Sequence, residues 1–260
     1  MNQVSKLQQI GQGRSATVFL EQDTLGGEMV RKIFTGEGVS KLVLFILTGS
    51  ANPYTWCEAA IRTAITRRNI LLPLVRFWFG DKLRVLRSNG WSWKDELKAF
   101  EIRAELIKGS HAPLKSPFLK EEPDYITRLI KEVMEPLQKH LADAGFDGLV
   151  WQAGLGNPVA SNNFMLESLP GEPLKWVWID LESGVPALFA MNPLATLGFY
   201  LPKSFQHGRP LFDDVHLGNL RKYLQANRDA IVAALGLEEF ALLTEHTDQL
   251  ESIQQEWRSL

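Results

Sequence analysis

The chain has 260 residues, of which 45% are hydrophobic and 22% are charged, and its formal net charge is −2. This length and apolar content suffice to bury one substantial core or two lobes that share a cleft. The nearly neutral charge excludes the strong basic field that recruits nucleic acid, so no nucleic-acid partner is expected. Cys57 is the only cysteine, which excludes an intrachain disulfide framework and a zinc site built from thiolates.

Neither membrane insertion nor secretion is expected from the sequence. The most apolar run, Leu42 to Leu47, is far shorter than the roughly 20 residues that a helix needs to span a bilayer. Residues 1–13 lack the apolar segment of a signal peptide. We therefore expect a cytoplasmic protein without a membrane span.

Residues 5–34 are predicted to form three strands of a small antiparallel sheet. The first hairpin has a glycine turn, and its second strand, Thr17 to Leu20, has β-branched and aromatic side chains. Gly26 and Gly27 make the next turn, and two sets of side chains alternate from Glu28 to Phe34.

The middle of the chain is predicted to contain one further hairpin between helices. Apolar residues recur at helical spacing over residues 56–68, whereas residues 71–86 are predicted to form a hairpin. A break near Ser88 precedes helical patterns over residues 93–108 and 123–144. The lobe boundary is therefore placed near Ser88.

The C-terminal part is predicted to contain an elaborate loop followed by helices. Residues 148–184 lose the helical period and are expected to form strands around that loop. The tail returns to helix, with Asp213 or Asp214 as the N-cap of a segment that ends near Leu235. A last helix is expected toward Leu260.

The segment from Ile10 to Val18 resembles the glycine-rich loop of protein kinases, GxGxxGxV, with Ala16 in place of the third glycine. A backbone that donates amide hydrogens to phosphate oxygens needs small side chains at the closest approach. The glycines lie between two strands, which disfavours both the Rossmann fingerprint and the Walker loop. The alternative is an ordinary glycine hairpin. The resemblance implies nucleotide contacts by Gly11, Gly13, Ala16 and Val18.

Lys32, in the strand after this hairpin, is at the position of the kinase lysine that binds the α and β phosphates. The resemblance also implies a carboxylate partner from the following helix, for which Glu58 is the candidate. The alternatives are a solvated lysine on an edge strand and a helix N-terminal acid favoured by the macrodipole.

Residues 178–184 resemble the strand and metal-binding DFG segment of kinases, with Asp-Leu-Glu in place of Asp-Phe-Gly. The resemblance makes Asp180 a magnesium ligand and Asn163 a second one, with Asn162 as a one-position alternative to Asn163. Without that role, Asp180 would be a strand-end turn residue and Asn163 a loop amide bonded to backbone.

The catalytic aspartate of the kinase HRD motif has no counterpart in this sequence. If residues 148–150 are laid on the preceding strand, the HRD positions hold Trp151, Gln152 and Ala153; counting back from Asn163 gives Pro158 instead. Neither Ala153 nor Pro158 can act as a base. The catalytic residue is therefore unknown, and the nearest acids are Asp147, Glu167 and Glu182.

The resemblance implies an α+β, protein-kinase-like two-lobed fold, with a small antiparallel-sheet N-lobe (1–88) and a mainly helical C-lobe (89–260). It implies binding of ATP with Mg²⁺ and phosphoryl transfer to an unknown protein or small-molecule acceptor. The main alternative is a pseudokinase that binds nucleotide without transferring phosphate. Nucleotidyl transfer is a third hypothesis.

Overall fold

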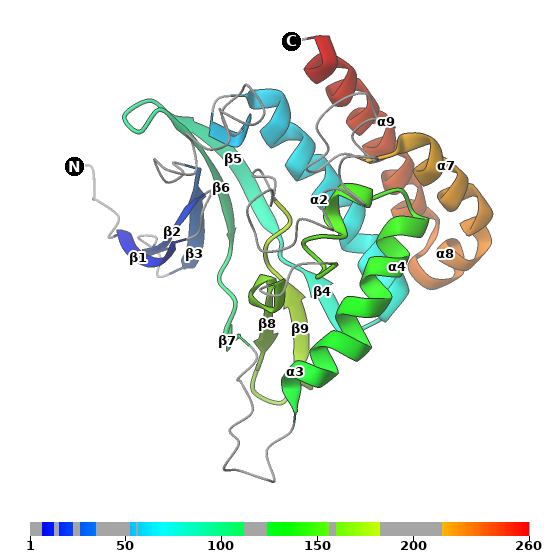
Figure 1. Ribbon diagram of the computed structural model, residues 1–260, viewed down its shortest axis with the longest axis horizontal. Coiled ribbons are helices and arrows are strands. Elements are labelled where there is room, and N and C mark those ends of the chain that lie inside the picture. The colour runs from blue at the N-terminus through cyan, green and yellow to red at the C-terminus, as the bar shows by residue number, and fades with distance from the viewer. Residues whose placement is uncertain are drawn as a thin grey trace.

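The computed structural model describes residues 7–12, 16–22, 27–34, 53–55, 57–111, 124–155, 160–182 and 215–259 (Figure 1). These ranges form two β-sheets, with helices lying along one side of them. Several residues singled out from the sequence lie outside the described ranges, namely Gly13, Pro158, Asp213, Asp214 and the run from Leu42 to Leu47.

The first sheet contains five antiparallel strands in the order β1-β2-β3-β6-β5. They are β1 (Leu7–Gln12), β2 (Thr17–Gln22), β3 (Glu28–Ile33), β5 (Ser88–Lys94) and β6 (Ala99–Glu105). The first three confirm the strands predicted for residues 5–34. Val18 is paired with Gly11 on one side and Lys32 on the other. Directly paired residues point to the same face of a sheet, so Val18 and Lys32 share a face.

β5 and β6 correct the helix that was expected over residues 93–108. β6 lies between β3 and β5, and the residues from Ala99 to Ile102 are all buried. A strand covered on both faces lacks the alternation of polar and apolar side chains that identifies a half-buried strand. The sheet consequently continues past residue 88, where the lobe boundary is expected.

The second sheet has the order β4-β9-β8-β7. It consists of β4 (Leu83–Val85), β7 (Gly109–Ser110), β8 (Phe164–Glu167) and β9 (Lys175–Trp178), and only the β4–β9 pair is parallel. β8 and β9 confirm the strands expected within residues 148–184. β7 approaches β8 so closely that only glycine fits at residue 109: a Cβ atom on Gly109 would lie 2.2 Å from the carbonyl oxygen of Leu166.

The helix α2 (Glu58–Phe79) is continuous, so the hairpin expected over residues 71–86 is wrong. The helix of residues 123–144 and the C-terminal helices are confirmed. His216 is the N-cap of the first C-terminal helix, α7. The other described helical elements are η1 (Pro53–Thr55), α3 (Tyr125–Arg128), η2 (Leu129–Met134), α4 (Glu135–Asp143), η3 (Asp147–Leu149), η4 (Ala160–Asn163), α7 (Leu217–Ala226), α8 (Arg228–Leu235) and α9 (Leu237–Ser259).

Two hydrophobic clusters form the core, and α2 contributes to both. Its first half, from Ala59 to Ala64, packs with the first sheet, and its second half, from Ile70 to Val75, packs with the second sheet and the C-terminal helices. α9 lies along α2 (Figure 1), and Arg62 Nη1 lies 2.8 Å from Glu256 Oε2 across that contact. The fold is thus the expected α+β class, with an antiparallel sheet in the N-terminal part and mainly helices in the C-terminal part.

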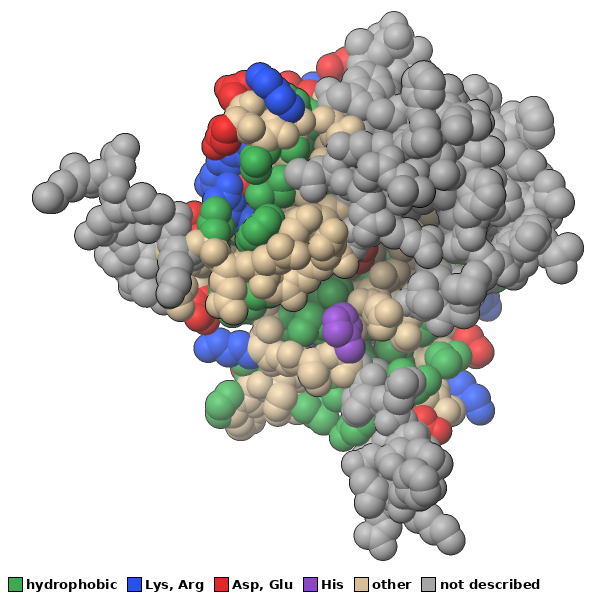
Figure 2. Space-filling view, turned by 60° about the vertical axis from the view of Figure 1, so that its left-hand side comes forward, with side chains coloured by type: hydrophobic (Ala, Val, Ile, Leu, Met, Phe, Trp, Pro, Cys, Tyr) green, Lys and Arg blue, Asp and Glu red, His purple; other side chains and the backbone are tan. Residues whose placement is uncertain are grey.

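The described surface is mixed in charge. On the face shown in Figure 2, Lys and Arg side chains are scattered among Asp and Glu side chains. Asp95 and Lys98, both well exposed at the β5–β6 turn, are an example of such opposite charges lying together. Within the described ranges, no helix is both long enough and apolar enough to cross a bilayer.

Candidate active site

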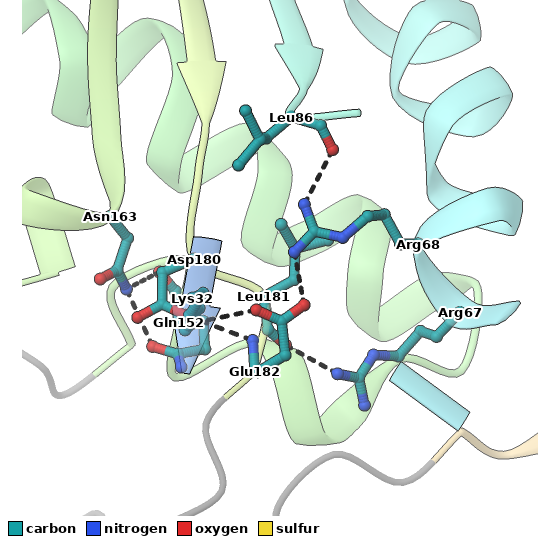
Figure 3. A network of polar contacts seen from close by, with 9 residues as sticks. All are labelled: Lys32, Arg67, Arg68, Leu86, Gln152, Asn163, Asp180, Leu181 and Glu182. Carbon is teal, nitrogen blue, oxygen red and sulfur yellow. Dashed lines mark hydrogen bonds and ion pairs between the residues drawn. The ribbon is translucent and has the colours of Figure 1, made fainter. Parts of the chain in front are cut away.

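Lys32 of β3 meets two carboxylates that follow β9 (Figure 3). Its Nζ atom lies 2.6 Å from Asp180 Oδ1 and 3.0 Å from Glu182 Oε2. The side chain of Asp180 is 36% exposed and that of Glu182 is 0% exposed. The contact therefore joins the first sheet to the end of the second, with one carboxylate open to solvent and one buried.

β9 positions these carboxylates because its own side chains are in the core. Val177 and Trp178 are fully buried, and Leu181 packs in the same hydrophobic cluster as Trp178. Between them, the Ile179 amide donates to the Asn163 carbonyl oxygen at 2.8 Å, which ties the segment to the start of β8. Asp180 leaves the sheet between two buried anchors and projects from a fixed backbone.

Asn163, the last residue of η4, lies beside Asp180 (Figure 3). Its Nδ2 atom donates to the Gln152 carbonyl oxygen at 2.9 Å and to Gln152 Oε1 at 2.8 Å. A backbone carbonyl accepts hydrogen bonds only, so the amide orientation of Asn163 is fixed by this partner. Oδ1 is thereby the oxygen left for another ligand, and it has no hydrogen bond within the described residues.

Two adjacent arginines of α2 hold the segment that carries the carboxylates. Arg68 donates to Glu182 Oε1 and, at 2.8 Å, to the Leu86 carbonyl oxygen. Arg67 donates to the Leu181 carbonyl oxygen at 2.7 Å. Both guanidinium groups are buried, between the two halves of α2 that pack in the two clusters. A buried charge is tolerated only where it is paired, so these contacts are structural requirements of the helix.

The charges of Lys32 and Glu182 stabilise each other. Burial alone would raise the pKa of Glu182, but the opposite charges of Arg68 and Lys32 outweigh it and lower that pKa to about 2. Burial likewise opposes the charge of Lys32, but Asp180 and Glu182 outweigh it and raise the pKa of Lys32 above its ordinary value. Both groups are therefore ionised at neutral pH.

The pairing of Lys32 with Glu58 that was expected from the sequence is not formed. Glu58 is the exposed first residue of α2, and the carboxylates that contact Lys32 are Asp180 and Glu182. An acid in the first turn of a helix is favoured by the helix dipole, which accounts for Glu58 without Lys32. α2 instead reaches Lys32 indirectly, through Arg68 and Glu182.

The described part of the glycine hairpin lies on the same sheet as Lys32. Gly11 is in β1 opposite Val18, which in turn is opposite Lys32. A Cβ atom on Gly11 would make only an ordinary contact, 3.6 Å from Val18 Cβ. Ala16, in place of the third glycine, is buried in the hydrophobic cluster that packs with the first sheet. Their contacts with a nucleotide stay a prediction.

The positions expected for a catalytic base hold no acid in the described residues. Ala153 is fully buried in the core, and its carbonyl oxygen accepts from Gln138 Nε2 at 3.0 Å. Gln152 was named from the sequence only for its position, and the structure makes it the partner of Asn163. Asp147 is buried and takes part in other interactions.

Arg67 and Arg68 were not identified from the sequence. One feature of the sequence could have identified them: two adjacent arginines lie between two apolar stretches of the same helix. Such flanking indicates that the arginines are buried and therefore need partners. No group of three or more His, Cys, Asp or Glu side chains that could hold a metal occurs in the described residues. Asp180 and Asn163 alone would be a partial ligand set. That fits Mg²⁺, which commonly combines one or two protein oxygens with waters and phosphate oxygens.

The sequence matches no protein-family model and no curated protein. Among solved structures, it is similar to the Mycobacterium tuberculosis PknI kinase domain, at 14% identity over 98% of this chain and 100% of that chain, with a TM-score of 0.37. It is similar to the Rio2 kinase of Chaetomium thermophilum, solved as an ADP/Mg²⁺-phosphoaspartate complex, at 14% identity over 95% and 71% of the two chains, with a TM-score of 0.39. It is also similar to the MAP kinase LmaMPK10 of Leishmania major, at 12% identity over 93% of this chain and 77% of that chain, with a TM-score of 0.34.

The described residues thus have the expected α+β arrangement, with an antiparallel-sheet part and a helical part. The protein-kinase-like fold stays a prediction from the sequence. Identities of 12 to 14% concern the fold alone, and each TM-score is below 0.5.

Proposed function

We propose that the chain binds ATP with Mg²⁺ at Lys32, Asn163 and Asp180, and that it is an atypical phosphotransferase. The observation that carries the proposal is the contact of Lys32 with Asp180, at 2.6 Å, beside the Asn163 amide. A fixed cation next to the oxygens of a partly exposed carboxylate and an amide is the arrangement that binds a metal–triphosphate complex. The acceptor is an unidentified protein or small molecule.

Each residue has a separate part in this proposal. Lys32 would bind phosphate oxygens, since its Nζ atom has three donors on a strand held at both edges. Asp180 and the Oδ1 atom of Asn163 would hold Mg²⁺, which neutralises phosphate charge when it is bound. Gly11 and Val18, which are paired in register with Lys32 across β1, β2 and β3, would cover the nucleotide.

A regulatory nucleotide-binding module without transfer activity is the second candidate. The observation in its favour is that Ala153, one of the two positions expected for the catalytic aspartate, is fully buried and its side chain cannot accept a proton. Phosphoryl transfer depends mostly on positioning and electrostatic stabilisation, so a missing base lowers the rate more than it excludes the reaction. The two candidates share the same binding site.

Thermal unfolding with and without ligand tests the binding proposal. A ligand that binds only the folded state stabilises it by about 2.7 kcal/mol at a concentration of about 100 times its Kd. We expect ATP to raise the Tm in the presence of Mg²⁺ and much less in its absence. No Mg²⁺-dependent rise would reject the proposal. Incubation with ATP labelled at the γ and then the α phosphate separates phosphoryl transfer, nucleotidyl transfer and silent binding.

A further inference from the structure

We propose that Glu182, held by Arg68 of α2, is the residue that positions Lys32 for the phosphates and so leaves Asp180 to the metal. The inference rests on the proposed function and deepens it. Glu182 follows Asp180 by two residues, yet the two carboxylates differ in exposure, partners and the element that fixes them.

Both oxygens of Glu182 are already committed. Oε1 accepts from Arg68, and Oε2 lies 3.0 Å from Lys32 Nζ. The side chain is 0% exposed, so a hydrated metal ion cannot reach it without breaking this arrangement. Asp180 is different, because its contacts with Lys32 and with the Glu182 amide both use Oδ1, and its side chain is 36% exposed. Of the two, Asp180 is the carboxylate that can exchange Lys32 for a metal ion.

The position of Glu182 is set by a rigid element. Arg68 is fixed at two points, the carboxylate of Glu182 and the Leu86 carbonyl oxygen, and Arg67 fixes the preceding residue, Leu181. α2 is packed into both hydrophobic clusters and along α9, so this support joins both parts of the fold. A charged group held in this way loses little conformational freedom when its partner binds a ligand.

Lys32 keeps one carboxylate when Asp180 binds the metal. Without the metal, Lys32 has two anionic partners; with it, the contact with Glu182 would remain, and the other donors of the ammonium group would be free for the phosphates. Glu182 therefore has the part that was expected of Glu58, but from the other end of the site. It is a positioning residue, since it would act through Lys32.

Binding of MgATP and of adenosine, measured by calorimetry, tests this assignment. Removing Glu182 alone would leave Arg68 buried without a partner, so the main variant is the double substitution Arg68→Met with Glu182→Gln. The matched control makes the same substitutions in an exposed ion pair between α7 and α9, Arg221→Met with Glu251→Gln. Adenosine has no phosphate, so its binding reports on damage to the rest of the site.

We expect the double variant to bind MgATP about tenfold more weakly or worse, because a charge-assisted contact is lost. Adenosine affinity and the ratio of ATP affinities with and without Mg²⁺ should match the parent and the control. Unchanged MgATP affinity, or equal weakening of ATP and adenosine, would overturn the assignment. A changed Mg²⁺ ratio would also overturn it, because Glu182 would then be a metal ligand.

One further variant keeps the test decisive. If the double variant does not fold, Glu182→Asp keeps the charge near Arg68 but shortens the reach to Lys32. Weaker binding of MgATP with parent-like binding of adenosine is expected there, and parent-like MgATP affinity contradicts the proposal. Failure of the proposed function is recognised separately, as no Mg²⁺-dependent ATP binding by the parent.

Discussion

The Nζ atom of Lys32 lies 3.0 Å from Oε2 of Glu182, although the two residues are 150 positions apart in the sequence. The other oxygen of Glu182 accepts from Arg68 of α2. One buried carboxylate thus links a strand of the first sheet to the helix that packs in both hydrophobic clusters. The same link bears on the stability of the fold and on the candidate active site.

Replacing Lys32 or Asp180 should remove the Mg²⁺-dependent stabilisation by ATP. Lys32→Met removes the cation for the phosphates and Asp180→Asn removes the anionic metal ligand, so each should weaken MgATP binding by about tenfold or more. Thermal unfolding at fixed ATP, with and without Mg²⁺, measures the effect. Lys222→Ala and Asp229→Asn, both exposed, are the controls. A full Mg²⁺-dependent shift in Asp180→Asn contradicts its assignment as a ligand.

Acid should destabilise the fold through Glu182 over a defined range of pH. The pKa of this carboxyl is about 2 in the folded chain against an ordinary value of 4.5, so its contribution is present above pH 4.5 and is lost as the pH falls toward 2. The full contribution is on the order of a few kcal/mol, since one pKa unit corresponds to about 1.4 kcal/mol. Urea unfolding between pH 7 and pH 3 measures it.

The comparison for this pH prediction is the double variant Arg68→Met with Glu182→Gln, which has no ionisable side chain at position 182. Other carboxylates destabilise both proteins in acid. The difference in free energy of unfolding between parent and variant should therefore shrink as the pH falls from 4.5 to 3. A difference that stays constant over that range assigns the acid sensitivity to other groups.

The local patterns of this sequence predicted the elements that carry the site better than the contacts within it. The β1–β2 hairpin, the strand with Lys32 and the strand before Asp180 follow from alternation and glycine turns. β6 did not, because burial on both faces removes the alternation. The carboxylate partner of Lys32 was expected on α2. The structure instead places Glu182, which follows β9, against Lys32, and α2 supplies Arg68, which holds Glu182. Ion pairs between residues so far apart in the sequence depend on how whole helices and strands pack, and local sequence patterns do not predict that packing.

Changing Asn163 to aspartate should destabilise the fold, whereas the same change at Asn162 should not. The Asn163 amide group donates to two oxygens of Gln152, and a carboxylate there would place an acceptor against acceptors. We expect a loss of about 1–3 kcal/mol in the free energy of unfolding. Asn162 is exposed and is therefore the matched control. Equal effects at the two positions in urea unfolding would show that the Asn163–Gln152 contact is unimportant.

Replacing Gly11 by alanine should separate nucleotide binding from stability. The added Cβ atom would lie 3.6 Å from Val18 Cβ, an ordinary contact, so the free energy of unfolding should change by less than about 1 kcal/mol. If the hairpin covers the phosphates, the same methyl group should weaken MgATP binding without weakening adenosine binding. Gly109→Ala is the steric contrast, since its Cβ atom would lie 2.2 Å from a backbone oxygen and must push β7 from β8. Parent-like MgATP affinity in Gly11→Ala would place the phosphates away from β1, because a methyl group between the hairpin and the phosphates would prevent close backbone contact.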